Sequence, residues 1–241
     1  MRTASLIAGL CGVLTGWLGA QQTTVVYDGF DYLTGGCLAG GATGQGWSGT
    51  WGEAGDSGAD WSELIIGPGS FPVIPGEPAV VGNHIDLNFG TGDRRLTRRF
   101  ATPIGGGPAD TEIIFSCVMD FGPATGIDYA GIELSNSTGG ATIFLGKPPG
   151  AGPSNAGTIG MDIYGQGYTA TTATGSGKKF LQLRWSPNPT GPGDLTLLVR
   201  DAATGQVLGT VVRTVQRRRL PPIPARREVA GFARRVLAAF A

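Results

Sequence analysis

The feature that most constrains this chain is a series of short apolar runs that alternate with period two and are separated by turn residues. In one such run Leu181, Leu183 and Trp185 fall on the same face, as in a strand with one buried side. The 43 Gly and 16 Pro residues of the 241-residue chain stand between these runs and do not form a continuous tract, which is typical of many strands joined by many turns. No amphipathic helix is predicted between residues 21 and 216. The pattern favours an all-β, antiparallel fold, either a two-sheet sandwich or a barrel.

The alternation predicts about eleven strands. They are residues 23–27, 61–66, 79–89, 96–100, 112–121, 128–134, 141–145, 158–164, 180–185, 195–200 and 206–212. The run 112–121 is the longest apolar one, so we expect a central strand covered on both faces. Between the last two strands we expect a hairpin in which Asp201 begins the turn and Gly205 adopts a positive φ.

The first twenty residues have the order of parts of a secretory signal peptide. Arg2 provides a positive start, an apolar stretch runs from Leu6 to Leu18, and small residues precede Gln21. The apolar stretch is shorter than a membrane-spanning helix needs. We therefore expect residues 1–20 to be removed after Ala20, the mature chain to be exported to the periplasm, cell surface or medium, and no transmembrane span to remain.

Two cysteines would be left in the mature chain, Cys37 and Cys117. In an oxidising compartment such a pair suggests a disulfide, and closing a loop of about 80 residues would stabilise the fold by roughly 4–5 kcal/mol. The alternative is two separate thiols, because Cys117 lies in an apolar strand and buried thiols are common.

Charge is unevenly distributed along the chain. Residues 21–212 hold nine basic and 17 acidic side chains, whereas residues 213–241 hold eight basic side chains and a single acid, Glu228. An acidic body argues against nucleic acid as a partner, since phosphate binding requires a basic face.

Two sets of side chains are candidates for ligand binding. Trp47, Trp51 and Trp61 are candidates for stacking on a sugar ring, because Trp combines an apolar face with a polar N–H; the alternative is that they cover one end of the core. For calcium, which takes oxygen ligands from loops, the candidates are Asp28, Asp31, Asp56 and Asp60. The alternative for these carboxylates is that they stabilise turns.

Several segments resemble exported bacterial proteins with a concanavalin A-like (laminin-G-like) jelly-roll domain. They are Tyr27-Asp-Gly-Phe-Asp-Tyr32, Gly46-Trp-Ser-Gly-Thr-Trp51, Ile143-Phe-Leu-Gly-Lys147, Gly160-Met-Asp-Ile163, and the runs 180–184 and 195–199. The likeness covers about residues 25–212, so we expect residues 21–212 to form one sandwich domain. It implies two antiparallel sheets, glycan binding in many members and calcium in some.

The resemblance also raises the question of catalysis. Glucanases of this kind carry their carboxylates in a Glu-x-Asp-x-x-Glu-like array, which is missing here, and we predict no catalytic residues. The nearest approaches are Asp128 with Glu133, and Asp162 alone. The leading hypothesis is a non-catalytic module that binds carbohydrate or serves in surface adhesion. The first alternative is a glucanase-like hydrolase that uses these residues, and the second is a structural extracellular domain without a small ligand.

The C-terminal segment departs from the family. A further strand commonly returns beside the N-terminal strand there, but residues 213–241 show no period-two pattern and contain Arg217-Arg-Arg219 and Pro221-Pro222. One interpretation is a basic amphipathic helix from about Glu228 to Phe240, resting on a membrane or a partner. The other, which we favour, is a truncated or out-of-frame end.

Overall fold

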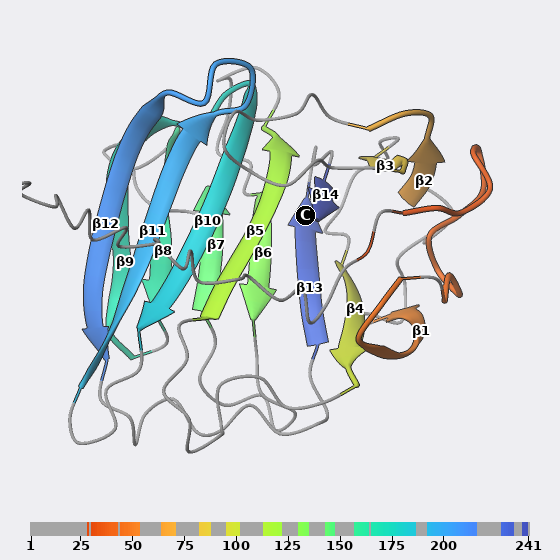
Figure 1. Ribbon diagram of the computed structural model, residues 1–241, viewed down its shortest axis with the longest axis horizontal. Coiled ribbons are helices and arrows are strands. Elements are labelled where there is room, and N and C mark those ends of the chain that lie inside the picture. Colours follow the sequence, from red (N-terminus) through yellow and green to blue (C-terminus); the bar gives the residue numbers. More distant parts are fainter. Residues whose placement is uncertain are drawn as a thin grey trace, which may run out of the picture.

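The chain folds into antiparallel β-sheets in a computed structural model (Figure 1). The structure describes residues 28, 30–42, 44–53, 64–70, 82–87, 95–101, 113–121, 130–134, 143–147, 157–163, 165–186, 192–215, 228–233 and 238–240. These residues form strands and turns and contain no helix. Accordingly, no described segment is a helix long and apolar enough to cross a membrane.

One sheet has seven strands, all paired antiparallel. In spatial order they are β1 (Trp47–Glu53), β4 (Arg95–Phe100), β13 (Glu228–Ala233), β6 (Ala130–Leu134), β7 (Ile143–Lys147), β8 (Thr158–Ile163) and β9 (Gly167–Thr174). The strands β6 to β9 follow one another as a meander, whereas β13 enters from the far end of the chain.

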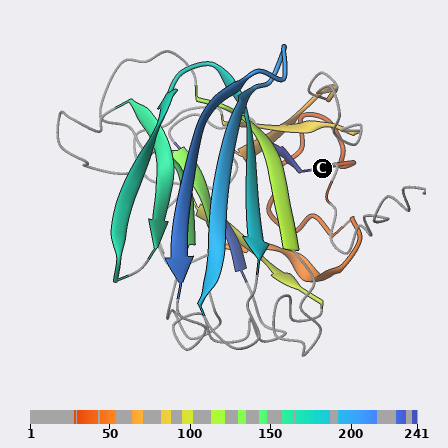
Figure 2. The same ribbon diagram turned by 60° about the vertical axis from the view of Figure 1, so that its left-hand side comes forward.

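The second sheet has five strands, also antiparallel. Their order is β12 (Val207–Val215), β11 (Gly193–Asp201), β10 (Lys178–Ser186), β5 (Ile113–Asp120) and β14 (Ala238–Phe240). A separate pair consists of β2 (Leu64–Gly67) and β3 (His84–Leu87). Figures 1 and 2 show the five-stranded sheet lying across the strands β6 to β9 as a second layer.

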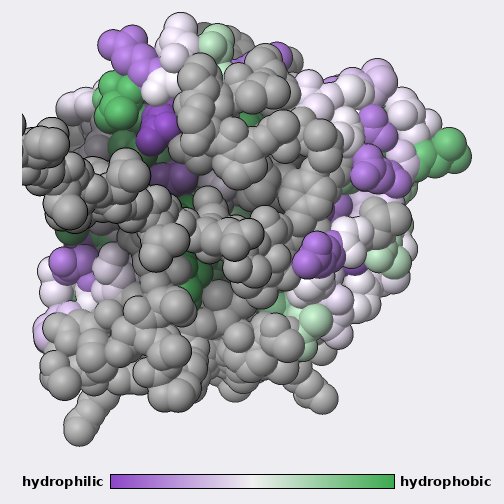
Figure 3. All heavy atoms as spheres, in the orientation of Figure 1, coloured by the Kyte–Doolittle hydropathy of each residue, from purple (hydrophilic) through white to green (hydrophobic). Residues whose placement is uncertain are grey.

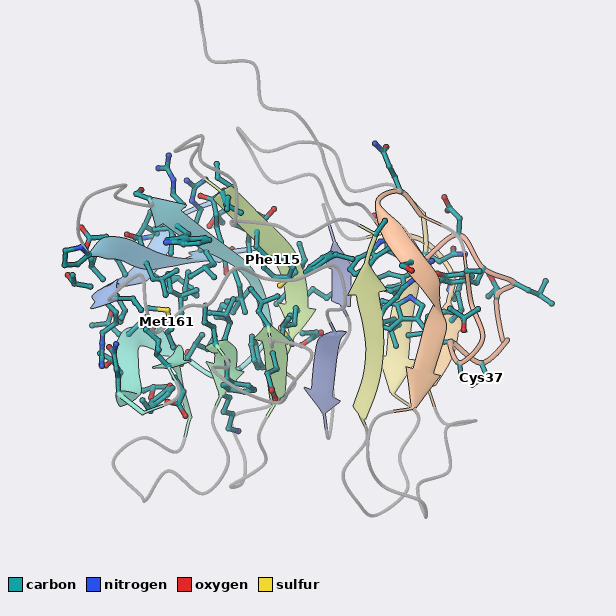
Figure 4. The ribbon with its side chains drawn as sticks, turned by 90° about the horizontal axis from the view of Figure 1, so that it is seen from below. Cys37, Phe115 and Met161 are labelled. Atoms are coloured by element: carbon teal, nitrogen blue, oxygen red, sulfur yellow. The ribbon has the colours of Figure 1, made fainter. Side chains whose placement is uncertain are left out.

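The core lies between these two layers. Alternate residues of β11, among them Leu195, Leu197 and Val199, are buried against the buried residues of β8, which include Ile159 and Met161. Figure 4 shows Met161 in the space between the layers. The period-two burial is the direct result of the pleat, which turns successive side chains to opposite faces. The arrangement is that of a β-sandwich.

Side-chain contacts join the two sheets along the β9 and β12 edges. The Thr172 hydroxyl donates to the carbonyl of Leu208 at 2.6 Å. Arg213 of β12 reaches across to β9 and its turn, donating to the carbonyl of Gln166 at 3.0 Å and to the hydroxyl of Thr169. Arg213 therefore belongs to the sandwich, although the sequence pattern ends at residue 212.

Most of the expected strands are confirmed within the described residues, with ends that differ by a few positions. The central position of the run 112–121 is also confirmed, because β5 lies between β10 and β14 and both Val118 and Met119 are fully buried. Gly205 has a φ of 72° and its N–H donates to the carbonyl of Asp201 at 2.9 Å, as the hairpin prediction requires. The strands β1 and β9 were not expected, and the expected strand 23–27 lies outside the described residues.

The expectation of a helix from about Glu228 to Phe240 is wrong. Residues 228–233 form β13, which pairs with β4 on one side and β6 on the other, and residues 238–240 form β14 beside β5. The physical reason is that β4 and β6 would otherwise each present an open edge of unpaired backbone groups. A strand of six residues within an Arg- and Ala-rich segment is too short for its alternation to be recognised.

The alternative of two separate thiols, not the disulfide, describes the cysteines. Cys37 is exposed and Cys117 is fully buried on β5, and the two are not bonded. Figure 4 shows Cys37 in the loop region at one side of the molecule, away from Phe115, which stands two residues before Cys117 on β5. Burial raises the pKa of the Cys117 thiol, because the charged thiolate is disfavoured away from water.

Candidate functional site

Four neighbouring strands bring two carboxylates and two aromatic rings into one row. Glu133 of β6 pairs with Phe144 of β7, Phe144 pairs with Asp162 of β8, and Asp162 pairs with Tyr168 of β9. Directly opposed residues of antiparallel strands point to the same face. The residues that precede or follow them, such as Leu145, are part of the core. The four side chains, which we call the β6–β9 row, therefore lie on the outer face of the seven-stranded sheet, and each is partly exposed.

Beside this row β6, β7 and β8 each carry a glycine. Gly131, Gly146 and Gly160 pair across β6, β7 and β8, two residues along each strand from the β6–β9 row. A Cβ at Gly131 would lie 2.4 Å from Cζ of Phe144, and one at Gly160 would lie 2.5 Å from the hydroxyl of Tyr168. The two rings therefore lie over glycine positions, and we call these three residues the glycine floor. It lets both rings lie along the sheet surface.

The ring of Tyr168 is fixed at its polar end. Its hydroxyl donates to the carbonyl of Thr158 at 3.0 Å. Burial raises the pKa of Tyr168 to about 12; a hydrogen bond with the side chain of Thr158 opposes this shift, and the negative charge of Asp162 adds to it. Tyr168 is therefore a neutral, oriented ring at neutral pH, with the Asp162 carboxylate close by.

The two carboxylates of the row are separated by one strand. Strands lie about 4.7–4.9 Å apart in a sheet, so the backbones at Glu133 and Asp162 are roughly 9–10 Å from each other. Carboxylates of inverting glycosidases stand about 6.5–9.5 Å apart, and those of retaining enzymes about 5–5.5 Å apart. Because Glu133 and Asp162 share one face, both can accept hydrogen bonds from a polyhydroxylated ligand. Their separation is also close to that of the general acid and general base of an inverting glycosidase.

A second cluster, next to β1 and β4, is buried and internally satisfied. The Asp28 carboxylate accepts hydrogen bonds from the Phe30 N–H at 2.9 Å, the Trp51 indole N–H at 2.9 Å and the Tyr32 hydroxyl at 3.0 Å. It also pairs with Arg98, whose Nη1 lies 2.5 Å from Oδ2. The side chains of the ion pair are 0% and 1% exposed. Both oxygens of Asp28 are thus engaged by protein groups.

Two of the three tryptophans proposed as sugar contacts belong to this cluster. Trp51 is 3% exposed, which leaves no open ring face. Trp47 stacks on Phe100, with ring centroids 5.0 Å apart and planes 18° apart, and the Arg98 guanidinium lies 5.3 Å from its centroid. These contacts correspond to the alternative interpretation, in which the rings cover one end of the core. Trp61 lies outside the described residues.

Of the remaining calcium candidates, only Asp31 lies among the described residues. Asp31 is exposed, and Asp56 and Asp60 lie outside the described residues. Within the described part of the chain, no group of three or more His, Cys, Asp or Glu side chains could hold a metal ion.

Sequence reasoning named Glu133 and Asp162 but did not place them together, and it missed Phe144 and Tyr168. The reason is that cross-strand register decides which residues share a row, and register cannot be read from one strand alone. Each of the four strands does contain a signal: a Gly or Ala stands two positions from a carboxylate or an aromatic residue, as in Gly160-Met-Asp162. Asp128, the other carboxylate considered for catalysis, lies outside the described residues.

Comparison with known proteins adds no assignment to this geometry. No family model matches the chain, and a search of curated proteins finds no relative.

Proposed function

We propose that this chain is an exported, non-catalytic carbohydrate-binding or adhesion module built on a concanavalin A-like jelly roll. The observation that carries the proposal is the β6–β9 row beside the glycine floor. Concanavalin A-like folds also have two antiparallel sheets. The C-terminal segment supplies a late strand, β13, but this strand lies between β4 and β6, whereas the resemblance implies a position beside the N-terminal strand.

Aromatic rings and carboxylates are complementary to the two kinds of surface on a sugar. The C–H face of a pyranose packs on an aromatic ring, and its hydroxyls donate to carboxylate oxygens. In the β6–β9 row rings and carboxylates alternate, so that Phe144 stands between Glu133 and Asp162. The glycine floor lets the rings of Phe144 and Tyr168 lie along the sheet, so that an extended ligand would meet a flat surface. We place the ligand on the outer face of β6 to β9.

A glycan array probed with the full chain and with single variants tests this proposal. Phe144→Ala should weaken binding to any retained glycan at least tenfold, because it removes the central ring. Val212→Ala is the control, since Val212 is 58% exposed on β12 of the other sheet and should leave binding unchanged. Absence of binding to every glycan, or equal binding by Phe144→Ala and the parent chain, would contradict the proposal and favour a structural domain without a ligand.

A second candidate function is glycoside hydrolysis, which the placement of Glu133 and Asp162 on one face favours. An inverting mechanism needs one carboxyl group to protonate the leaving oxygen and the other to activate water. A reducing-sugar assay on the glycans retained by the array separates the two functions. Turnover that is lost in both Glu133→Gln and Asp162→Asn, with glycan binding retained, would establish the enzyme. Binding without turnover leaves the non-catalytic module.

Export is tested separately. Residues 1–20 lie outside the described residues, and the proposal rests on their sequence pattern. Expression in a bacterium with a secretion pathway should yield a periplasmic or secreted chain whose mass corresponds to a start at Gln21. A cytoplasmic product that retains Met1 would contradict it.

A further inference from the structure

The outer face of β6 to β9 carries acidic side chains and no basic ones. The only lysine or arginine in these four strands is Lys147. It pairs with a core residue of β6 and therefore starts from the inner face, because directly opposed residues share a face. The outer face instead holds Glu133 and Asp162, which the register of β7 places on one row. A ligand on this face therefore meets negative charge.

The basic residues of the neighbouring strands do not neutralise this charge at Asp162. Arg95 and Arg99 of β4 are in register with the outer face, but β4 lies four strands from β8, which is roughly 19 Å and more than twice the screening length at physiological salt. Arg213 of β12 pairs with a core residue of β11, and its guanidinium donates to the carbonyl and the side chain of Gln166. The charge of Asp162 is therefore left to act on a ligand.

Asp162 has an aromatic residue on either side. Its cross-strand neighbours are Phe144 and Tyr168, and side chains in such pairs start about 4.5–5.5 Å apart at their Cβ atoms. The ring of Tyr168 lies over Gly160, two residues from Asp162 on the same strand. Burial is the main cause of the raised pKa of Tyr168, and the charge of Asp162 adds to it. Carboxylate and rings therefore belong to one patch of the sheet surface.

A carboxylate flanked by aromatic rings favours a cationic group. An ammonium forms a charge-assisted hydrogen bond with the carboxylate, which is stronger than the bond that a neutral hydroxyl donates. The same ammonium is attracted to the faces of aromatic rings. A uronate or a sulfate on a saccharide would instead be repelled by Glu133 and Asp162. The β6–β9 row should therefore bind cationic saccharides most tightly, neutral ones less tightly and acidic ones least.

We propose that the β6–β9 row recognises glucosamine oligosaccharides whose amino groups are not acetylated, and that one ammonium group binds at Asp162. This inference rests on the proposed carbohydrate-binding function and adds the class of saccharide. Phe144 and Tyr168 offer apolar surface to the sugar on either side of the bound ammonium. A further amino group along the same saccharide meets Glu133, which lies on the other side of Phe144.

Titration calorimetry of the full chain with four tetrasaccharides tests the proposal. They consist of glucosamine, N-acetylglucosamine, glucose (cellotetraose) and galacturonic acid, at one ionic strength and about pH 5.5, where aspartate is ionised and the amines are protonated. We expect the glucosamine tetrasaccharide to bind at least tenfold more tightly than the two neutral ones, and the galacturonic acid tetrasaccharide to bind most weakly. Asp162→Asn should weaken binding of the glucosamine tetrasaccharide at least fivefold and leave that of cellotetraose within twofold.

Asp194→Asn is the matched control, because it also removes one carboxylate. Asp194 is exposed on β11, which belongs to the sheet nearer the viewer in Figures 1 and 3, on the opposite side of the sandwich from the β6–β9 row. The control should stay within twofold of the parent for every saccharide. Equal effects of Asp162→Asn and Asp194→Asn would overturn the proposal, because they would mean that the acidic chain attracts a cationic saccharide without a site.

The ranking of the four saccharides by the parent chain is a second measurement, and it does not depend on the folding of any variant. Neutral tetrasaccharides that bind as tightly as the glucosamine tetrasaccharide would overturn the proposal. If cellotetraose binding is then lost in Phe144→Ala, the carbohydrate-binding function still stands and only the preference for amino sugars is refuted. Absence of binding to all four saccharides would end both proposals.

Discussion

Replacement of Asp28 by Asn should remove a large part of the stability of the fold. The carboxylate is fully buried and receives four donors, of which Tyr32, Trp51 and Arg98 converge on the same oxygen. Asn keeps the shape but loses the charge, so the Arg98 guanidinium stays buried without its carboxylate. Breaking such a pair from one side costs about 3–5 kcal/mol, in a domain whose whole unfolding free energy is of the order of 5–15 kcal/mol.

A double-mutant cycle with Arg98→Met separates the ion pair from the surrounding packing. Arg98→Met leaves the carboxylate with three of its donors, and we expect a cost of roughly 3 kcal/mol. The double variant Asp28→Asn/Arg98→Met carries no buried charge, so its cost should fall short of the sum of the two single costs by at least about 1.5 kcal/mol.

Urea unfolding followed by tryptophan fluorescence measures all four chains. The cost of each single variant should be nearly the same in 50 and 500 mM NaCl, since buried charges are screened far less than exposed ones. Single costs below about 1 kcal/mol that also add within about 0.5 kcal/mol would refute the reasoning, because they would mean that the pair is solvated in solution.

Three further outcomes are expected. A thiol reagent should modify Cys37 rapidly and Cys117 only after unfolding, because Cys117 is buried and its pKa is raised. Mass spectrometry of the native and the denatured chain checks this, and rapid labelling of both cysteines in the native chain would contradict it. The free energy of unfolding should fall as the pH rises from about 10 to about 12, because the pKa of Tyr168 in the folded chain lies above its ordinary value and the stabilisation present below pH 10 is lost when Tyr168 ionises. In urea titrations Tyr168→Phe should show a smaller fall, and an equal fall would exclude Tyr168 as the cause. Truncation after Val215 removes β13 and β14 and should abolish cooperative unfolding in calorimetry. An unchanged transition would show that both strands are dispensable.

The class of fold could be predicted because strands with one or two buried faces leave a local record. The alternation of Leu195, Leu197 and Val199 and the turn at Gly205 are examples, since each depends only on neighbouring residues. What could not be predicted is the partner of each strand. Residues 228–233 have too little apolar periodicity to be recognised, and only the open edges of β4 and β6 explain why they form a strand.

The candidate site was predictable only in fragments for the same reason. Glu133 and Asp162 were selected as carboxylates, but their common face depends on the register of β7 between them. Trp51 was selected for its chemistry, whereas the structure uses that chemistry internally, in a hydrogen bond to Asp28. A polar handle on an aromatic ring fits a buried carboxylate as well as a ligand, and sequence does not separate the two.

The position of β13 has a consequence for the order in which the molecule can assemble. In the seven-stranded sheet β1 and β4 are connected to β6 through β13 alone, and Thr97 meets Glu133 only through Ala230. During synthesis from the N-terminus, the two halves of that sheet therefore have to wait for nearly the whole chain before they can join. Such late closure slows folding, since distant segments must meet first. For a chain that is threaded unfolded through a membrane pore, the delay would be an advantage, because it keeps the earlier segments open until the last strand has emerged.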